Sequence, residues 1–283
     1  MPRIDLGEAR IACTDIGSGE TVLLLHATAS SRAQWGVLAE ALRTSWHVLA
    51  PDLYGYGETD PWPGNNPFAL ADEAALAEAV LPPGDDPIHL IGHSYGGAVA
   101  LRFAMQWPER LLSLVLIEPV AFHLLWDEPP HPADRQLVHE VGEIAALVSR
   151  AVTNGDYRRA MARFVDYWNG DGAWSRTRPD LQSELAGRIP KVALDFRATT
   201  TELASRAAYG RIAAPTLVLR GSRSPPPTLR IAELVAHSLP QSRLQTIDGA
   251  GHMLPLTHAE AVNAAIVEHL LRRTPGRRHP AAA

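Results

Sequence analysis

The sequence predicts an α/β protein built on a mostly parallel sheet, from two observations. Short apolar runs of strand length recur along the chain, at 21–27, 46–53, 88–94, 111–119 and 215–221, and a further strand is expected at 243–249. Such runs are typical of strands that are buried on both faces, as in a parallel sheet. Helical patterns, such as residues 67–80 and 96–107, separate these runs.

Length and composition bound the class of protein. The chain has 283 residues, 46% of them apolar and 20% charged, which is an ordinary balance for a large globular domain. The net charge is −5, and no dense Lys/Arg run precedes the C-terminal tail, so we expect no nucleic-acid partner. From about residue 274 this tail is expected to be disordered.

The sequence also favours a cytoplasmic location without a membrane partner. Residues 1–13 hold no apolar signal segment, and no stretch approaches the roughly 18 apolar residues of a membrane span. Cys13 is the only cysteine, which excludes an intrachain disulfide, and it is expected to lie inertly in a strand. We expect a monomer or a homodimer.

The rhythm of strands and helices changes after Pro119. Up to about residue 208 the pattern is helical and rich in large aromatic side chains, and the strand signal then returns. We therefore expect a discontinuous α/β core, 1–120 and 209–283, interrupted by a helical cap at 121–208. Thr257 and Glu260 form a T-x-x-E pattern, which predicts a capping box at the start of the last helix.

A serine flanked by glycines stands where one apolar strand runs into an apolar helix. Residues 92–96, Gly-His-Ser-Tyr-Gly, fit the pattern G-x-S-x-G, which is weak alone but is strengthened by this strand–turn–helix context. The glycines let strand and helix pass closely, and the strained serine backbone lifts Oγ out at the carboxyl end of the sheet. The N–H of Tyr95 then lies at a helix N-terminus, where negative charge is favoured. Ser94 is the predicted nucleophile.

With this motif in place, the chain resembles the α/β-hydrolase superfamily over nearly its whole length. The segments that carry the resemblance are VLLLHATASSRAQW, PDLYGYGETDP, GHSYGG, LVLIEP and GAGHMLPLTH. The resemblance implies an eight-stranded, mostly parallel sheet and a helical cap after the sixth strand. It also implies an oxyanion hole formed by Tyr95, Thr28 and Ala27, the last of which stands where the family has glycine. No G-x-G-x-x-G follows a strand and the histidines show no H-E-x-x-H or comparable spacing, so we expect no metal or other cofactor.

A serine nucleophile needs a neighbouring base, and His252 is the predicted one. It follows a predicted strand on a Gly-rich loop, in the chain order serine, acid, histidine that this fold uses. His26 and His93 also lie in motifs at strand ends, where packing and local hydrogen bonds are the expected role. His258 falls in the first turn of the last helix and is expected to be exposed.

The acid that completes such a site is missing from its usual place. In the superfamily it follows the strand at 215–221, but that position is Ser224, and the first carboxylate beyond it is Glu233. Glu118 is the predicted acid, because it ends the strand next to that of the nucleophile, and some family members take the acid from there. An unpaired carboxylate after LVLI is otherwise costly. Asp248 is the reserve candidate.

The nucleophile and the cap together predict the substrate. A serine attacks a carbonyl, which favours small-molecule esters, lactones or thioesters, and an aromatic-rich cap suits an apolar or aryl group. The predicted substrate-binding residues are Phe122, Trp126, Phe164, Trp168 and Met253. A carbon–carbon bond hydrolase of ring-cleavage diketones, which needs a cationic pocket, and a non-catalytic binding protein remain alternatives. Arg163 and Arg197 are candidates to recognise a substrate carboxylate, although surface solvation is the simpler role.

Overall fold

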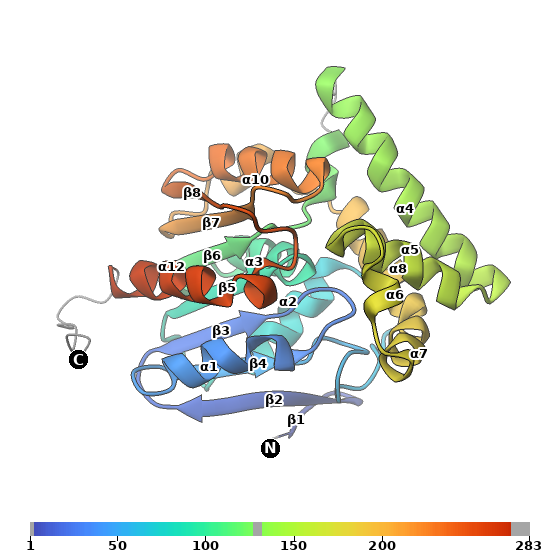
Figure 1. Cartoon of the computed structure of the whole chain (residues 1–283). Helices are drawn as coiled ribbons and strands as arrows, with labels where there is room; N and C mark the ends of the chain where they lie inside the picture. Colours follow the sequence, from blue (N-terminus) through green and yellow to red (C-terminus); the bar gives the residue numbers. More distant parts are fainter. Residues whose placement is uncertain (1–2, 127–131, 273–283) are drawn as a thin grey trace.

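The computed structural model describes residues 3–126 and 132–272, and its centre is an eight-stranded sheet (Figure 1). The strands follow the order β1-β2-β4-β3-β5-β6-β7-β8, and from β4 to β8 all neighbours are parallel. Their bounds are β1 Arg3–Leu6, β2 Ala9–Gly17, β3 Thr21–Leu25, β4 His47–Pro51, β5 Ile88–His93, β6 Leu111–Ile117, β7 Thr216–Gly221 and β8 Ser242–Ile247. The fold class predicted from the sequence is confirmed, and each of the six segments expected to be strands contains one.

The first two strands are not among the predicted apolar runs. β2 pairs antiparallel with β4 and β1 pairs antiparallel with β2, at the edge of the sheet. The C-terminal half of β2, residues 14–17, alternates exposed and partly buried residues, so it lacks the unbroken apolar pattern of the central strands. Cys13 lies buried in β2, where burial raises the pKa of its thiol to about 12.

Helices cover both faces of the sheet. α1 (Gly36–Leu42) and α12 (Ala259–Leu271) lie side by side on one face, where an apolar cluster includes Leu42, Val262 and Ile266 (Figure 1). α2 (Leu70–Ala79), α3 (Tyr95–Gln106) and α10 (Pro226–Ser238) belong to the larger cluster on the other face. The central strands are therefore buried from both sides, as their unalternated sequences require.

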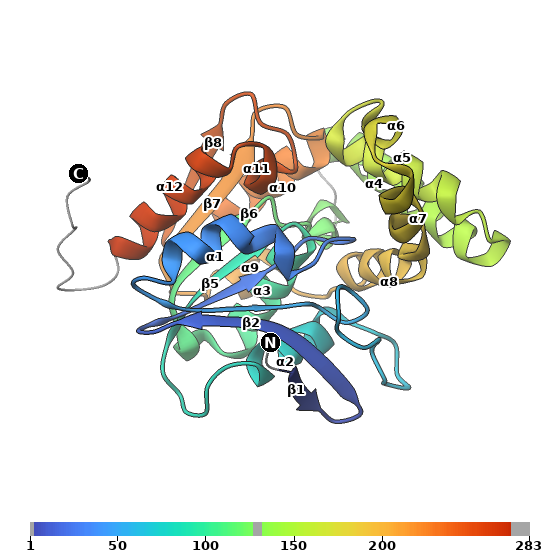
Figure 2. The same cartoon turned by 60° about the horizontal axis from the view of Figure 1, so that its bottom comes forward.

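A group of helices between β6 and β7 lies beside the sheet and outside both helical layers (Figures 1 and 2). Its main members are α4 (Arg135–Asn154), α5 (Tyr157–Asn169), α6 (Ala173–Arg176), α7 (Pro179–Gly187) and α8 (Ile189–Thr200). The short helix α9 (Arg206–Tyr209) already packs on α10 and α3. The cap boundaries at 121 and 208 stay predictions, and the tail from residue 274 lies outside the described residues.

The predicted capping box at the start of the last helix is wrong. α12 begins at Ala259 after His258, whose side chain makes no capping hydrogen bond. Thr257 instead ends a short helix, α11 (Leu254–Thr257), and its hydroxyl donates to the Met253 carbonyl. A threonine that already sits in a helical turn bonds back to that turn and cannot serve as the cap of the next helix.

Candidate active site

Ser94 occupies the corner between β5, which ends at His93, and α3, which begins at Tyr95. Its backbone has φ 56° and ψ −115°, a strained conformation for a residue with a side chain. The flanking glycines are required here: a Cβ on Gly92 would meet the Gly96 carbonyl oxygen at 2.3 Å, and one on Gly96 would meet the Leu25 carbonyl oxygen at 2.2 Å. Strand, turn and helix thus pass too closely for any larger residue.

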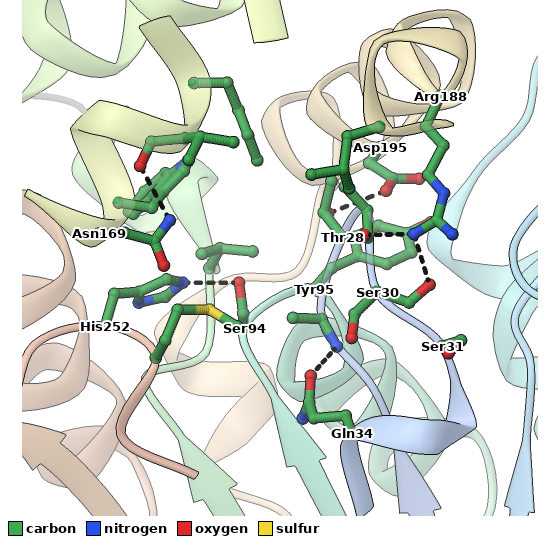
Figure 3. Close-up of a pocket in the computed structure, with 18 of the residues that line it drawn as sticks. Thr28, Ser30, Ser31, Gln34, Ser94, Tyr95, Asn169, Arg188, Asp195 and His252 are labelled. Atoms are coloured by element: carbon green, nitrogen blue, oxygen red, sulfur yellow. Dashed lines mark hydrogen bonds between the residues drawn. The ribbon is translucent and has the colours of Figure 1, made fainter. Parts of the chain in front are cut away.

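Ser94, His252 and Glu118 form one hydrogen-bonded chain of buried side chains. His252 Nε2 lies 2.9 Å from Ser94 Oγ, and His252 Nδ1 lies 2.6 Å from Glu118 Oε2. Figure 3 shows the imidazole and the hydroxyl facing each other across the floor of a cavity. Because the carboxylate accepts a hydrogen bond from Nδ1–H, Nε2 carries no proton and can accept the proton of the serine hydroxyl.

The Glu118 carboxylate is held from three sides. Glu118 follows β6 with a left-handed backbone, φ 43°, which turns its side chain toward the end of β7. Besides His252, its donors are the Gly221 N–H, at 2.6 Å, and the Ser224 hydroxyl. The reserve candidate Asp248 is exposed and accepts a hydrogen bond from Ser222, 3.0 Å away, so it has no place beside the imidazole.

The two histidines expected to have packing roles are fully buried. His93 Nε2 donates to the His252 carbonyl at 2.9 Å, and burial lowers the pKa of His93 well below its ordinary value. His26 accepts the Leu53 N–H at Nε2 and donates from Nδ1 to the Ala27 carbonyl, and burial lowers its pKa to about 4. Both are therefore neutral at pH 7, and both fix loops around Ser94.

The predicted oxyanion loop, residues 27–31 after β3, lies across the cavity from His252 (Figure 3). The Tyr95 N–H opens α3, and within the described part of the chain neither it nor the Thr28 N–H has an acceptor. The Ala27 N–H, by contrast, donates to Gln34 Oε1 at 3.2 Å. The structure therefore leaves Tyr95 and Thr28 as candidate donors and corrects the prediction for Ala27, which lines the site without offering its N–H.

A cavity of about 540 Å³ opens over Ser94 and separates the sheet from the helices after β6. Four of the five predicted substrate-binding residues line it: Phe122, Phe164, Trp168 and Met253. Trp126 does not. It ends the 3₁₀ helix Phe122–Trp126 with 37% of its surface exposed, so the prediction for this residue is corrected.

Aromatic rings lie beside the His252 imidazole and line the cavity near it. The Trp168 indole lies 4.5 Å from the His252 imidazole between ring centroids, and Phe122 and Phe196 stack at 5.8 Å. Arg163 and Arg197 are exposed and lie outside the cavity lining, in agreement with the simpler role expected for them. The wall next to the hydroxyl is thus aromatic.

Several residues that line the cavity were not predicted from the sequence. Gln34, Arg188, Asp195 and Phe196 are the clearest cases, the last three of them at the start of α8 or within it. One signal was available: Lys191 and Asp195 are spaced i, i+4 in an otherwise apolar helical pattern. A buried ion pair of this kind points to a site or a contact between layers.

The described residues contain no group of three or more His, Cys, Asp or Glu side chains placed to hold a metal ion. Within the same residues, no helix is long and apolar enough to cross a membrane. The arrangement that is present, a serine hydroxyl hydrogen-bonded to an imidazole beside free backbone N–H groups, is suited to acyl transfer to water. Fold and site together define a hydrolase.

The chain belongs to the alpha/beta hydrolase fold family, whose family model matches residues 20–259. It is 30% identical to a pimeloyl-[acyl-carrier protein] methyl ester esterase of Neisseria meningitidis serogroup B over 250 residues, which cover 86% of this chain and 90% of the relative. The predicted membership of this superfamily is confirmed, as is the prediction of an enzyme of the hydrolase class.

Solved structures share the fold over nearly the whole chain. An esterase from Thermogutta terrifontis is 24% identical with a TM-score of 0.71, covering 96% of this chain and 99% of that one. The enol-lactonase from Burkholderia xenovorans LB400 is 15% identical with a TM-score of 0.74, covering 95% and 100%. The named relatives and neighbours are hydrolases of esters or lactones, the class predicted from the sequence.

Proposed function

We propose that this protein is a serine hydrolase of carboxylic esters or lactones that acts through Ser94, His252 and Glu118. The observation that carries the proposal is the continuous hydrogen-bonded chain from Ser94 Oγ through the imidazole to the Glu118 carboxylate. A hydroxyl alone is a weak nucleophile, and this chain supplies both a base and a charge that stabilises the imidazolium.

In the first step Ser94 Oγ adds to the substrate carbonyl while His252 Nε2 takes the hydroxyl proton. The carbonyl oxygen becomes an oxyanion, which the N–H groups of Tyr95 and Thr28 are placed to stabilise. Glu118 stays ionised and holds the imidazolium through Nδ1–H. Collapse of the tetrahedral intermediate breaks the bond to the alcohol oxygen, which receives the proton from His252.

In the second step water cleaves the acyl-enzyme. His252 removes a proton from the attacking water, hydroxide adds to the acyl carbonyl, and the same N–H groups stabilise the second oxyanion. The carboxylic acid then leaves as the proton returns to Ser94 Oγ. No group other than those of the chain and water is needed to balance the reaction.

The cavity lining supports a small-molecule substrate with an apolar or aryl group. Phe122, Phe164, Trp168 and Phe196 supply four rings around a space of about 540 Å³. The Neisseria meningitidis relative, a pimeloyl-[acyl-carrier protein] methyl ester esterase, adds methyl esters to the candidates. Whether the protein is a monomer or a homodimer stays a prediction.

The cavity gives less support to the carbon–carbon bond hydrolase. A dianionic diketone needs uncompensated positive charge, but the one arginine among the lining residues, Arg188, pairs with Glu184 and donates to the Ala29 carbonyl. The complete chain of Ser94, His252 and Glu118 likewise disfavours a non-catalytic binding protein.

The test is hydrolysis of p-nitrophenyl esters of increasing chain length, together with methyl esters and γ-lactones, by the wild type and Ser94→Ala. We expect turnover that depends on Ser94, with a preference set by the cavity. Equal rates for the two proteins on every substrate would falsify the proposal. Turnover confined to vinylogous diketones would favour the carbon–carbon bond hydrolase instead.

A further inference from the structure

Asp195 of α8 is a buried carboxylate that the proposed reaction does not use. It is 2% exposed and lines the cavity, and it accepts the Thr28 hydroxyl at 2.8 Å and the Tyr56 hydroxyl at 2.6 Å. Its other oxygen accepts Lys191 Nζ. Of these donors, Thr28 lines the cavity and belongs to the oxyanion loop, so the carboxylate joins a helix of the cap region to that loop.

Lys191 extends this network to the second candidate oxyanion donor. Its ammonium group lies 3.0 Å from Glu73 Oε1 in α2, and 4.8 Å from the ring centroid of Tyr95. It also lies 4.6 Å from the Tyr56 ring and 4.8 Å from the Phe68 ring. One cation thus touches the residue whose N–H opens α3 and pairs with the carboxylate that holds Thr28.

A second charged residue holds the same loop from the other side. Arg188, immediately before α8, donates from Nη1 to the Ala29 carbonyl at 2.6 Å. The backbone of Ala29 has φ 56°, a strained conformation for a residue with a side chain, so this hydrogen bond helps to hold it. Figure 3 shows Arg188 and Asp195 reaching down from the helix toward Thr28 and Ser30.

We propose that Arg188 and Asp195 are positioning residues that hold the oxyanion loop, so that helix α8 completes the site rather than only covering it. The inference rests on the proposed function. Buried charges lower the stability of the fold unless each is paired, and an apolar contact would join the two layers without this desolvation penalty. Here the paired charges converge on the loop that bears Thr28 and on Tyr95, the two residues whose N–H groups must be aimed at the developing oxyanion.

The test separates positioning from plain stability by comparing kcat with KM. For a p-nitrophenyl ester, Thr28→Val and Asp195→Asn should each lower kcat about 10-fold to 100-fold, because misaimed donors lose transition-state stabilisation. KM should change less than about threefold. Thr28→Ser keeps the hydroxyl and should retain kcat within about threefold.

Two further measurements distinguish a loss of positioning from a folding defect. Arg188→Met leaves the buried cluster intact and should also lower kcat, whereas Arg197→Met, at an exposed position of α8, should not. Phenylboronic acid adds to a serine hydroxyl as a tetrahedral anion, so its inhibition constant should rise in parallel with the loss of kcat.

The outcomes are distinct. Wild-type kcat and boronate affinity in Thr28→Val, or losses confined to KM in all three test variants, would overturn the positioning role while the wild type remains an active esterase. A wild type without any Ser94-dependent turnover would instead remove the proposed function, and the inference with it.

Discussion

The Ser224 hydroxyl donates a hydrogen bond to the Glu118 carboxylate that holds His252. Ser224 stands where the superfamily that this chain resembles usually has its acid. In this chain the position therefore contributes a hydrogen-bond donor to the acid instead of the acid itself. Both residues are buried, at 5% and 0% exposure, so this hydrogen bond replaces solvation for a carboxylate that water does not reach.

Replacing Ser224 with alanine should lower kcat about 10-fold. A hydrogen bond to a charged acceptor contributes about 1.5–3 kcal/mol, and the Gly221 N–H remains to hold the carboxylate. Steady-state kinetics on a p-nitrophenyl ester measure the loss. Ser222→Ala is the matched control, since Ser222 bonds the exposed Asp248, and a loss of the same size in that variant would contradict the account.

The acid should be movable between the two positions. Glu118→Ala removes the carboxylate, and adding Ser224→Asp places another one where the hydroxyl touched it. We expect the double variant to recover at least about 10-fold in kcat over Glu118→Ala, because an imidazolium needs a nearby charge whichever strand supplies it. Equal rates for the single and double variants would show that residue 224 does not reach His252.

Enlarging the cavity should change the choice of substrate. Phe164→Ala removes a ring from the lining, so the ratio of kcat/KM for a long acyl ester to that for acetate should rise about 10-fold. Trp126→Ala removes a larger ring that lies outside the cavity, and its ratio should equal that of the wild type. An effect confined to Trp126→Ala would mean that the substrate takes another path.

The buried cluster makes a prediction for the pH dependence of stability. Burial raises the pKa of Glu73 from about 4.5 to about 7, and Lys191 opposes this rise without cancelling it. Between these values the folded state holds a proton that the unfolded state has lost, so stability falls as the pH rises through this window and is constant above it.

Glu73→Gln should remove this dependence. Between pH 5 and pH 8 the free energy of unfolding of the variant, relative to the wild type, should rise by up to about 3 kcal/mol. Urea unfolding at the two pH values measures it. Glu109→Gln, at an exposed position, is the control. A difference between wild type and Glu73→Gln that is the same at both pH values would contradict the raised pKa.

Much of the fold and of the site could be predicted from local patterns in the sequence. Unbroken apolar runs predict the central strands, and the glycines around Ser94 predict its corner, because both depend on neighbours in the sequence. Glu118 stood out because a carboxylate at the end of an apolar strand needs a partner. Its partners, Gly221 and Ser224, come from the neighbouring strand and the turn beyond it.

The residues that the sequence did not reveal depend on contacts between distant segments. Asp195 is 167 residues from Thr28 in the chain, and no local sequence pattern indicates that their side chains are in contact. Trp126 and Phe122 are both aromatic and four residues apart, yet only Phe122 enters the cavity. Which ring faces a cavity is decided by packing of the whole cap region, which a helical pattern alone does not determine.

The most direct test of the central claim is kcat of Glu118→Gln on a p-nitrophenyl ester, measured beside Asp248→Asn. The glutamine side chain keeps the shape of the glutamate but lacks its charge, so we expect kcat to fall on the order of 10³-fold to 10⁴-fold. Asp248→Asn should keep wild-type turnover. A Glu118→Gln enzyme with near-normal kcat, or an Asp248→Asn enzyme without activity, would contradict the assignment of the acid to Glu118.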